Sequence, residues 1–216
     1  MQDLIIGSTP LLIAFSVALF YYKKLEPSWF RLFPLFLFLM FSIQIGGYFY
    51  SAIFKKSNHF IFNCLTFIEY EFYIFIFSKA LTKKVLKTIA IAINLLFIIA
   101  FVYIIFYRSH FFVYNTLVNN IGEFLTLCCC FLYLSELLMI EELASYFVIP
   151  MFWITTGIMI SIVGDFLYLC FFNYIMENNL DPEGRVYGII MTSLSVIEYG
   201  FFTIGFLCKT LWEKTR

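Results

Sequence analysis

The most constraining feature of this sequence is an aspartate inside an apolar run that is long enough to cross a bilayer. The run is Trp153 to Asn173, WITTGIMISIVGDFLYLCFFN, and the aspartate is Asp165. A spanning helix needs about 20 mostly apolar residues, and an ionised carboxylate at the membrane centre costs roughly 2.5–3.5 kcal/mol on insertion scales. Such residues usually face the interior of a helix bundle and serve function. We therefore expect other segments to bring polar partners to Asp165.

The composition supports a membrane protein and excludes other classes. Of 216 residues, 62% are hydrophobic and only 13% are charged, whereas a water-soluble domain needs a more highly charged surface. The formal net charge is zero, which argues against nucleic acid as a partner. We therefore expect a protein that crosses the lipid bilayer several times, with no nucleic-acid partner and no cofactor.

Seven segments have the length and apolar character of membrane spans. They are residues 4–22, 32–54, 60–81, 88–107, 111–140, 147–176 and 186–212. The predicted fold is an all-α bundle of seven transmembrane helices that forms one domain over residues 1–216. Its connections are short, so the function must lie within the membrane or at its two faces.

The distribution of Lys and Arg predicts how the spans are oriented in the cell membrane. If the N-terminus lies outside, ten of the 14 basic residues fall on the cytoplasmic side. These ten are Lys23, Lys24, Arg31, Lys79, Lys83, Lys84, Lys87, Lys209, Lys214 and Arg216. The sequence therefore predicts an N-terminus outside and a cytoplasmic C-terminus.

Five of the predicted spans carry a polar residue at a similar depth. With a rise of 1.5 Å per residue, these residues lie about 14–18 Å from the outer end of their spans, near the middle of a ~30 Å hydrocarbon core. They are Gln44, Glu69, Glu123, Asp165 and Glu198. This coincidence predicts one polar layer to which five helices contribute.

Helical spacing within the spans extends this layer into stripes. Asn115, Asn119 and Glu123 recur every four residues, and Glu198 lies beside Tyr199 on the seventh segment. Residues three or four apart share one side of a helix. The candidate site residues for a ligand or proton are Gln44, Glu69, Glu71, Asn119, Glu123, Asp165, Glu198 and Tyr199. The alternative is that these polar stripes only hold helices together, since such residues often hydrogen-bond between membrane helices.

The chemistry of this layer is dominated by acids that have no basic residue at the same depth. Each carboxyl must therefore be protonated, hydrogen-bonded or paired with a cation from outside. Such a site could carry protons, bind a hard cation through oxygen ligands, or hold a ligand that bears an amine. The sequence leaves open whether a metal ion binds there.

Two internal similarities suggest that the chain contains a duplication. LTFIEYEFYIFIF at residues 65–77 aligns with LSVIEYGFFTIGF at 194–206, and IGGYFY at 45–50 aligns with VGDFLY at 163–168. The second and third spans would then correspond to the sixth and seventh, with the fourth as an inverting linker. This 3+1+3 plan resembles the architecture of SWEET-type transporters, whose Pro-Gln motif is absent here.

Catalysis has less support than binding. His59 and His110, the two histidines, lie at the predicted outer ends of spans, too shallow for an intramembrane zinc site. An aspartyl intramembrane protease needs two membrane aspartates, and Asp165 is the only one. The run GIMISIVGDFLYL at residues 157–169 resembles a motif of lysoplasmalogenase-like membrane hydrolases, although that family carries the motif in an early span. Lipid hydrolysis is therefore a second alternative.

A further resemblance covers most of the chain. It is carried by Phe62-Asn63, Ile68-Glu69 and Phe72-Tyr73 in the third segment, by SELL at residues 135–138 and by PMFWITTGI at 150–158. These residues resemble uncharacterised seven-span proteins of Bacteroidota, some of which are similar to membrane sensing modules. We expect a sensing or signal-transmitting module whose acidic layer binds a small polar or cationic ligand and whose cytoplasmic ends contact a signalling partner. The first alternative is a proton- or cation-coupled transporter of small solutes.

Overall fold

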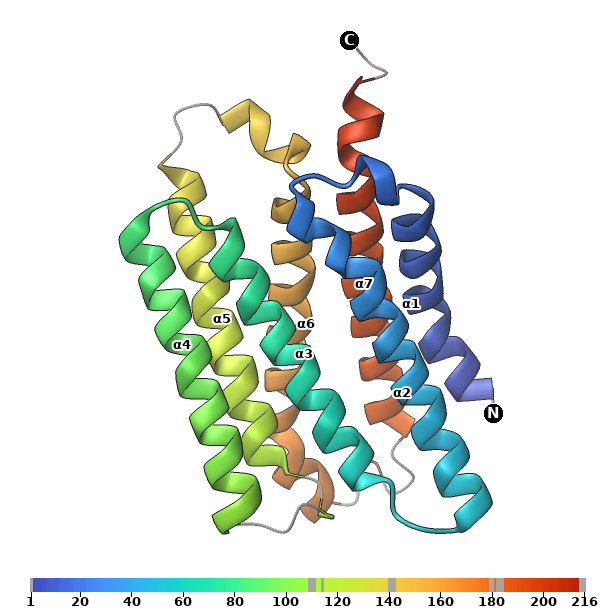
Figure 1. The fold of residues 1–216 in the computed structure, drawn as a ribbon. Helices are drawn as coiled ribbons and strands as arrows, with labels where there is room; N and C mark the ends of the chain where they lie inside the picture. Colours follow the sequence, from blue (N-terminus) through green and yellow to red (C-terminus); the bar gives the residue numbers. More distant parts are fainter. Residues whose placement is uncertain are drawn as a thin grey trace. The chain divides into compact units, whose positions relative to one another are not determined.

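The chain folds into long helices joined by short connections, as the sequence predicts. The computed structural model describes residues 2–108, 112–113, 115–139, 143–178, 181 and 185–213, and within these ranges it contains seven long helices (Figure 1). They are α1 (Gln2–Phe20), α2 (Phe33–Phe54), α3 (His59–Ala80), α4 (Lys84–Tyr103), α5 (Thr116–Leu138), α6 (Pro150–Glu177) and α7 (Arg185–Glu213). Short helical turns are η1 (Tyr22–Lys24), η2 (Ser28–Leu32), η3 (Ile104–Arg108) and η4 (Leu143–Val148). The predicted all-α class is confirmed.

The helices have the length and apolar surface of membrane spans. Six segments of the described chain, one in each of α2 to α7, are long and apolar enough to cross a membrane, and Ser8–Phe20 in α1 forms a shorter apolar helix. On α4, Val85, Leu95, Leu96 and Ile99 are each more than half exposed. Large apolar side chains exposed in this density suit lipid rather than water. The chain is therefore a multi-pass membrane protein.

The helices group into two compact units. One unit comprises Met1–Leu25 and Glu142–Arg216, and the other comprises Glu26–Glu141. The first contains α1, α6 and α7, and the second contains α2 to α5. A 3+1+3 duplication would instead group the first three helices and the last three. The duplication stays a prediction, and the two compact units do not coincide with its proposed halves.

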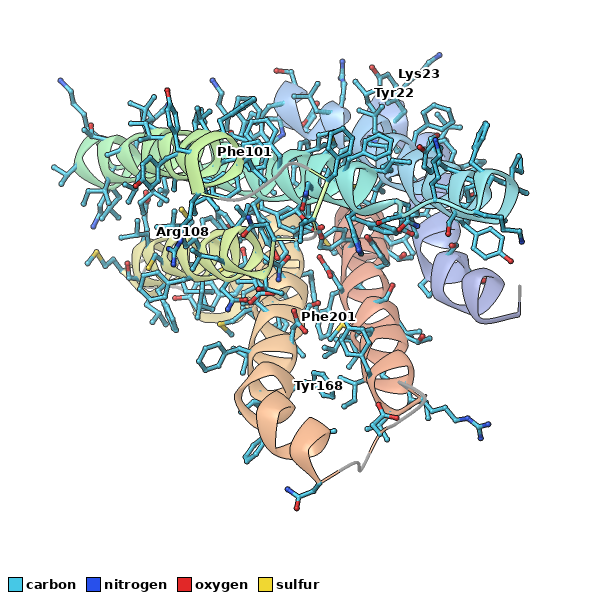
Figure 2. All side chains as sticks on the ribbon, turned by 90° about the horizontal axis from the view of Figure 1, so that it is seen from below. Tyr22, Lys23, Phe101, Arg108, Tyr168 and Phe201 are labelled. Carbon is cyan, nitrogen blue, oxygen red and sulfur yellow. The ribbon has the colours of Figure 1, made fainter. Side chains whose placement is uncertain are left out.

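Glycines allow close packing within the unit formed by α1, α6 and α7. A Cβ atom added at Gly157 of α6 would lie 2.8 Å from Cβ of Phe201 and 3.1 Å from the backbone oxygen of Glu198, both on α7. The Phe201 ring also packs 5.8 Å from the Trp153 ring, centroid to centroid (Phe201 is labelled in Figure 2). Small residues bring membrane helices together in this way. Gly157 therefore fixes the spacing between α6 and α7.

Aromatic rings fill the interior of the unit formed by α2 to α5. Phe36 of α2 stacks on Phe72 of α3 with 4.0 Å between ring centroids, and Phe67 of α3 lies 4.5 Å from Phe101 of α4 (Phe101 is labelled in Figure 2). Aromatic pairs at such distances add stabilisation beyond the area that they bury. The many Phe residues of these spans therefore serve helix packing as well as contact with lipid.

The start of α7 is held by the carboxylate of Asp181. Its Oδ1 accepts a hydrogen bond from the backbone N–H of Val186 at 3.1 Å, and its Oδ2 accepts one from Tyr187 at 3.0 Å. These N–H donors, the Tyr187 amide first among them, hold the pKa of Asp181 below its usual range. The negative charge also suits the partial positive charge at the start of a helix. Asp181 therefore has a structural role.

Three predicted span boundaries need correction. The fifth span was predicted to begin at residue 111, but α5 begins at Thr116 because the Asn115 side chain caps it, accepting from Val118 N–H at 3.3 Å. The sixth was predicted from 147, but residues 143–148 form the separate turn η4 and α6 begins at Pro150. The fourth begins at Lys84 rather than residue 88, and it ends in a π-helical turn, η3. Asn115 thus precedes the stripe that carries Glu123.

Candidate functional site

Glu123, the most buried of the described acids in the α2–α5 unit, is held by one neighbour on α3 and one on its own helix, α5. The hydroxyl of Tyr70 on α3 lies 3.1 Å from Asn119 Oδ1 and 3.4 Å from Glu123 Oε1, both on α5. Asn119 Nδ2 donates to the same Glu123 Oε1 at 2.6 Å. We call these three residues the Glu123 cluster. Asn119 and Glu123 were predicted site residues, and the structure brings them together.

A glycine positions the tyrosine of this cluster. Gly122 lies on α5 beside Glu123, and a Cβ atom added there would lie 2.6 Å from Cγ of the Tyr70 ring. The ring therefore occupies the space that any other side chain at this position would need. The Tyr70 ring also meets Phe97 of α4 edge-on, with 6.0 Å between centroids. The close approach of α3 and α5 at Gly122 delivers the Tyr70 hydroxyl to Glu123.

The Glu123 cluster is buried in an apolar part of the chain. Glu123 is 4% exposed, and α5 contains no Lys or Arg. One turn further along the helix, Thr126 is fully buried and its hydroxyl has no hydrogen-bond partner among the described residues. The cluster thus brings a carboxyl, an amide and a phenol together in a part of the chain that excludes water.

One of the two acids of α3, Glu71, contacts a different helix. Glu71 Oε2 accepts a hydrogen bond from Asn94 Nδ2 of α4 at 2.5 Å, and its Oε1 is buried with no hydrogen-bond partner among the described residues. Glu71 was predicted as a site residue, but Asn94 was not. Asn94 is the single polar residue in the run IAIAINLLFIIAF, so no helical repeat marks it in the sequence.

The other acid of α3, Glu69, hydrogen-bonds to a residue one turn along its own helix. Glu69 Oε1 accepts from the hydroxyl of Tyr73, one turn away, at 3.5 Å. Successive residues of an α-helix point about 100° apart, so Glu69, Tyr70 and Glu71 must point in three directions. The structure therefore gives the predicted acids of α3 separate partners, rather than placing both beside Glu123.

The other predicted site residues lie on α2, α6 and α7. Gln44 is half-buried on α2 and Asp165 is half-buried on α6, and neither side chain hydrogen-bonds to a described residue. Glu198 and Tyr199 are buried on α7, where the Tyr199 ring meets Phe202 with 5.7 Å between centroids. The candidates thus divide between the two units: Asp165, Glu198 and Tyr199 in one, the other five in the second. A single layer across both units stays a prediction.

Two further buried polar residues secure the ends of helices. Asn63 of α3 donates through Nδ2 to the Val113 carbonyl at 2.9 Å and accepts through Oδ1 from the Asn115 N–H at 3.2 Å. It therefore ties the chain before α5 to α3. The buried amide of Asn63 in the third span therefore has a structural role and not one in ligand binding.

Glu136 plays a similar part at the other end of α5. It is 8% exposed, and its Oε1 accepts from the backbone N–H groups of Thr82 at 2.9 Å and Lys83 at 3.0 Å, and from the Thr82 hydroxyl. Lys83 directly precedes α4, so this carboxylate satisfies N–H groups at the start of that helix. Its partners are 53 and 54 residues away in sequence, so no local pattern reveals this contact.

Within the described ranges, no group of three or more His, Cys, Asp or Glu residues could hold a metal ion.

Comparison of the chain with protein-family models, with curated proteins and with solved structures finds no match. The resemblances to Bacteroidota proteins, SWEET-type transporters and lysoplasmalogenase-like hydrolases therefore stay predictions.

Proposed function

We propose that this multi-pass membrane protein is a sensing module that binds a small cationic or polar ligand at the Glu123 cluster. The observation that carries the proposal is the carboxyl of Glu123, 4% exposed within an apolar span and held by Tyr70 and Asn119. Packing alone does not require an acid at this position, since an amide would bond to the same two groups. An acid adds the ability to balance a positive charge.

The position of the cluster supports signal transmission by helix movement. Tyr70 and Glu123 lie on two different helices, α3 and α5, so a ligand that binds the carboxyl competes for bonds that join these helices. The connections at the ends of these helices are short, and a cytoplasmic signalling partner would therefore contact helix ends and turns. Binding would bias the spacing of α3 and α5, and the partner would detect it at those ends.

Coupled transport is the second candidate, because a phenol and a carboxyl hydrogen-bonded within a span can pass a proton between them. The two functions differ in one observable. An imposed proton gradient would drive a transporter to accumulate radiolabelled methylammonium or sodium inside proteoliposomes. A sensor would bind the cation without moving it across the bilayer.

Ligand binding is tested on the purified full-length chain in neutral detergent. Thermal unfolding is followed while sodium, potassium or methylammonium chloride replaces N-methylglucamine chloride at constant ionic strength. A cation that binds only the folded chain should stabilise it by about 2.7 kcal/mol at 100 times its dissociation constant. An unfolding midpoint that is the same in every salt would contradict cation binding.

We also propose that the N-terminus lies outside the cell and the C-terminus in the cytoplasm. The support is the excess of Lys and Arg on one side of the spans, ten of 14 residues. Fusions at the C-terminus test this orientation: green fluorescent protein should fluoresce there, and alkaline phosphatase should be inactive. The opposite pair of results would reverse the orientation.

A further inference from the structure

The turn between α3 and α4 carries the densest group of basic residues in the described chain. Lys79, Lys83, Lys84 and Lys87 lie within nine residues of sequence, and we call them the lysine turn. The first three are exposed and Lys87 is half-exposed. Lys83 interacts electrostatically with Glu136, and no ion pair within the described chain is seen for the other three. The lysine turn therefore presents positive charge at one end of the α2–α5 unit.

A described acid that contacts this turn, Glu136, is engaged by the backbone. The carboxylate of Glu136 accepts from the N–H groups of Thr82 and Lys83 and is buried, so it fixes the backbone that carries the lysines. The Nζ atom of Lys83 extends to the sulfur of Met139 at the end of α5, and Lys79 Nζ lies 5.3 Å from the Phe75 ring centroid. The lysine side chains thus extend from a backbone that the buried carboxylate of Glu136 holds in place.

An apolar surface continues directly from the lysines along α4. Val85, which follows Lys84, is 71% exposed, and Ile89, one turn later and two residues after Lys87, is 41% exposed. Residues four apart share one side of a helix, so Val85 and Ile89 form an apolar strip that begins at the lysine turn. A partner that fits must have a negative head and an apolar tail.

We propose that the lysine turn binds the headgroup of an anionic phospholipid, whose acyl chains lie along Val85 and Ile89. Clusters of four or more Lys or Arg at the end of a membrane helix attract anionic lipids. A free anion would satisfy the lysines but would not contact the apolar strip that continues from them along α4. This proposal is independent of what binds at the Glu123 cluster.

The test compares two short-chain lipids on the full-length protein in neutral detergent. Native mass spectrometry measures the dissociation constants of dioctanoyl phosphatidylglycerol and dioctanoyl phosphatidylcholine, which differ in net charge but share the phosphate and the acyl chains. We expect the parent chain to prefer phosphatidylglycerol. A lysine near the surface contributes about fivefold in affinity, so the double variant Lys83→Gln, Lys84→Gln should lose about 25-fold.

Two further variants separate charge at this turn from charge elsewhere. Lys83→Arg with Lys84→Arg should keep the preference, because the charge remains. Lys55→Gln with Lys56→Gln removes two exposed lysines at the other end of α3 and should leave the preference unchanged. Equal affinity of the parent chain for the two lipids would overturn the proposal whether or not the variants fold. So would an equal loss in the Lys55, Lys56 variant.

Discussion

Replacing Gly157 by alanine should force α6 and α7 apart and lower the free energy of unfolding by about 3 kcal/mol, the upper part of the range for overpacked cores. The added Cβ would lie 2.8 Å from Cβ of Phe201 and 3.1 Å from the backbone oxygen of Glu198. Neither atom can turn away by a change of rotamer, so the helices themselves must move. Unfolding of the detergent-solubilised chain, followed by helical circular dichroism, measures the loss.

Gly200→Ala on α7 is the matched control. A Cβ atom there meets nothing within 4 Å, so alanine should be neutral or stabilise the helix by up to about 1 kcal/mol. If Gly157→Ala is as stable as Gly200→Ala, then α6 and α7 do not pack at the distance described here.

Replacing Gly122 by alanine should displace the Tyr70 ring and lower the free energy of unfolding by about 1–3 kcal/mol. The added Cβ would lie 2.6 Å from ring carbon Cγ, and a shifted ring would carry the Tyr70 hydroxyl away from Asn119 and Glu123. The variant should therefore be less stable and should also respond less to a cation. Thermal unfolding with and without the cation measures both effects.

Gly46→Ala on α2 of the same unit is the control for this second substitution, because nothing lies within 4 Å of a Cβ at that position. Its stability and its response to cations should both match the parent chain. A Gly122→Ala variant that behaves like Gly46→Ala would show that Tyr70 does not occupy the space beside Gly122.

The helices could be predicted from sequence because long apolar runs with few charges specify membrane spans almost by composition alone. Boundaries were less certain where one polar side chain decides them. The capping bond of Asn115 starts α5 at Thr116, and an asparagine in an otherwise apolar run gives the same periodicity whether it caps a helix or lies within it. The grouping of α1 with α6 and α7 also has no local signal, because it depends on contacts between distant parts of the chain.

The candidate site was predicted in part. Depth along a helix can be counted in sequence, so Glu123 and Asn119 were recognised on one stripe, and their hydrogen bond is present. Direction around the bundle cannot be counted in this way. Consequently Glu69 and Glu71 were expected to join the same site, whereas they hydrogen-bond to Tyr73 and Asn94.

Residues with distant partners were harder to interpret. Glu136 lies in the SELL segment, which in the sequence carries only a resemblance to other proteins, and its role depends on N–H groups at the start of α4. Tyr70 was not among the predicted site residues, because its place beside Glu123 depends on the space that Gly122 leaves on α5. In each case the missing information was which helix lies opposite.

The central claim is that Glu123 binds a positively charged ligand rather than only joining two helices. The most direct measurement is the cation-induced rise in unfolding midpoint of Glu123→Gln beside the parent chain and Glu69→Gln. The amide has nearly the shape of the acid and can still accept from Tyr70 and Asn119, so all three should fold. We predict that the parent and Glu69→Gln rise with sodium or methylammonium, and that Glu123→Gln does not. A full rise in Glu123→Gln would contradict a cation site at Glu123.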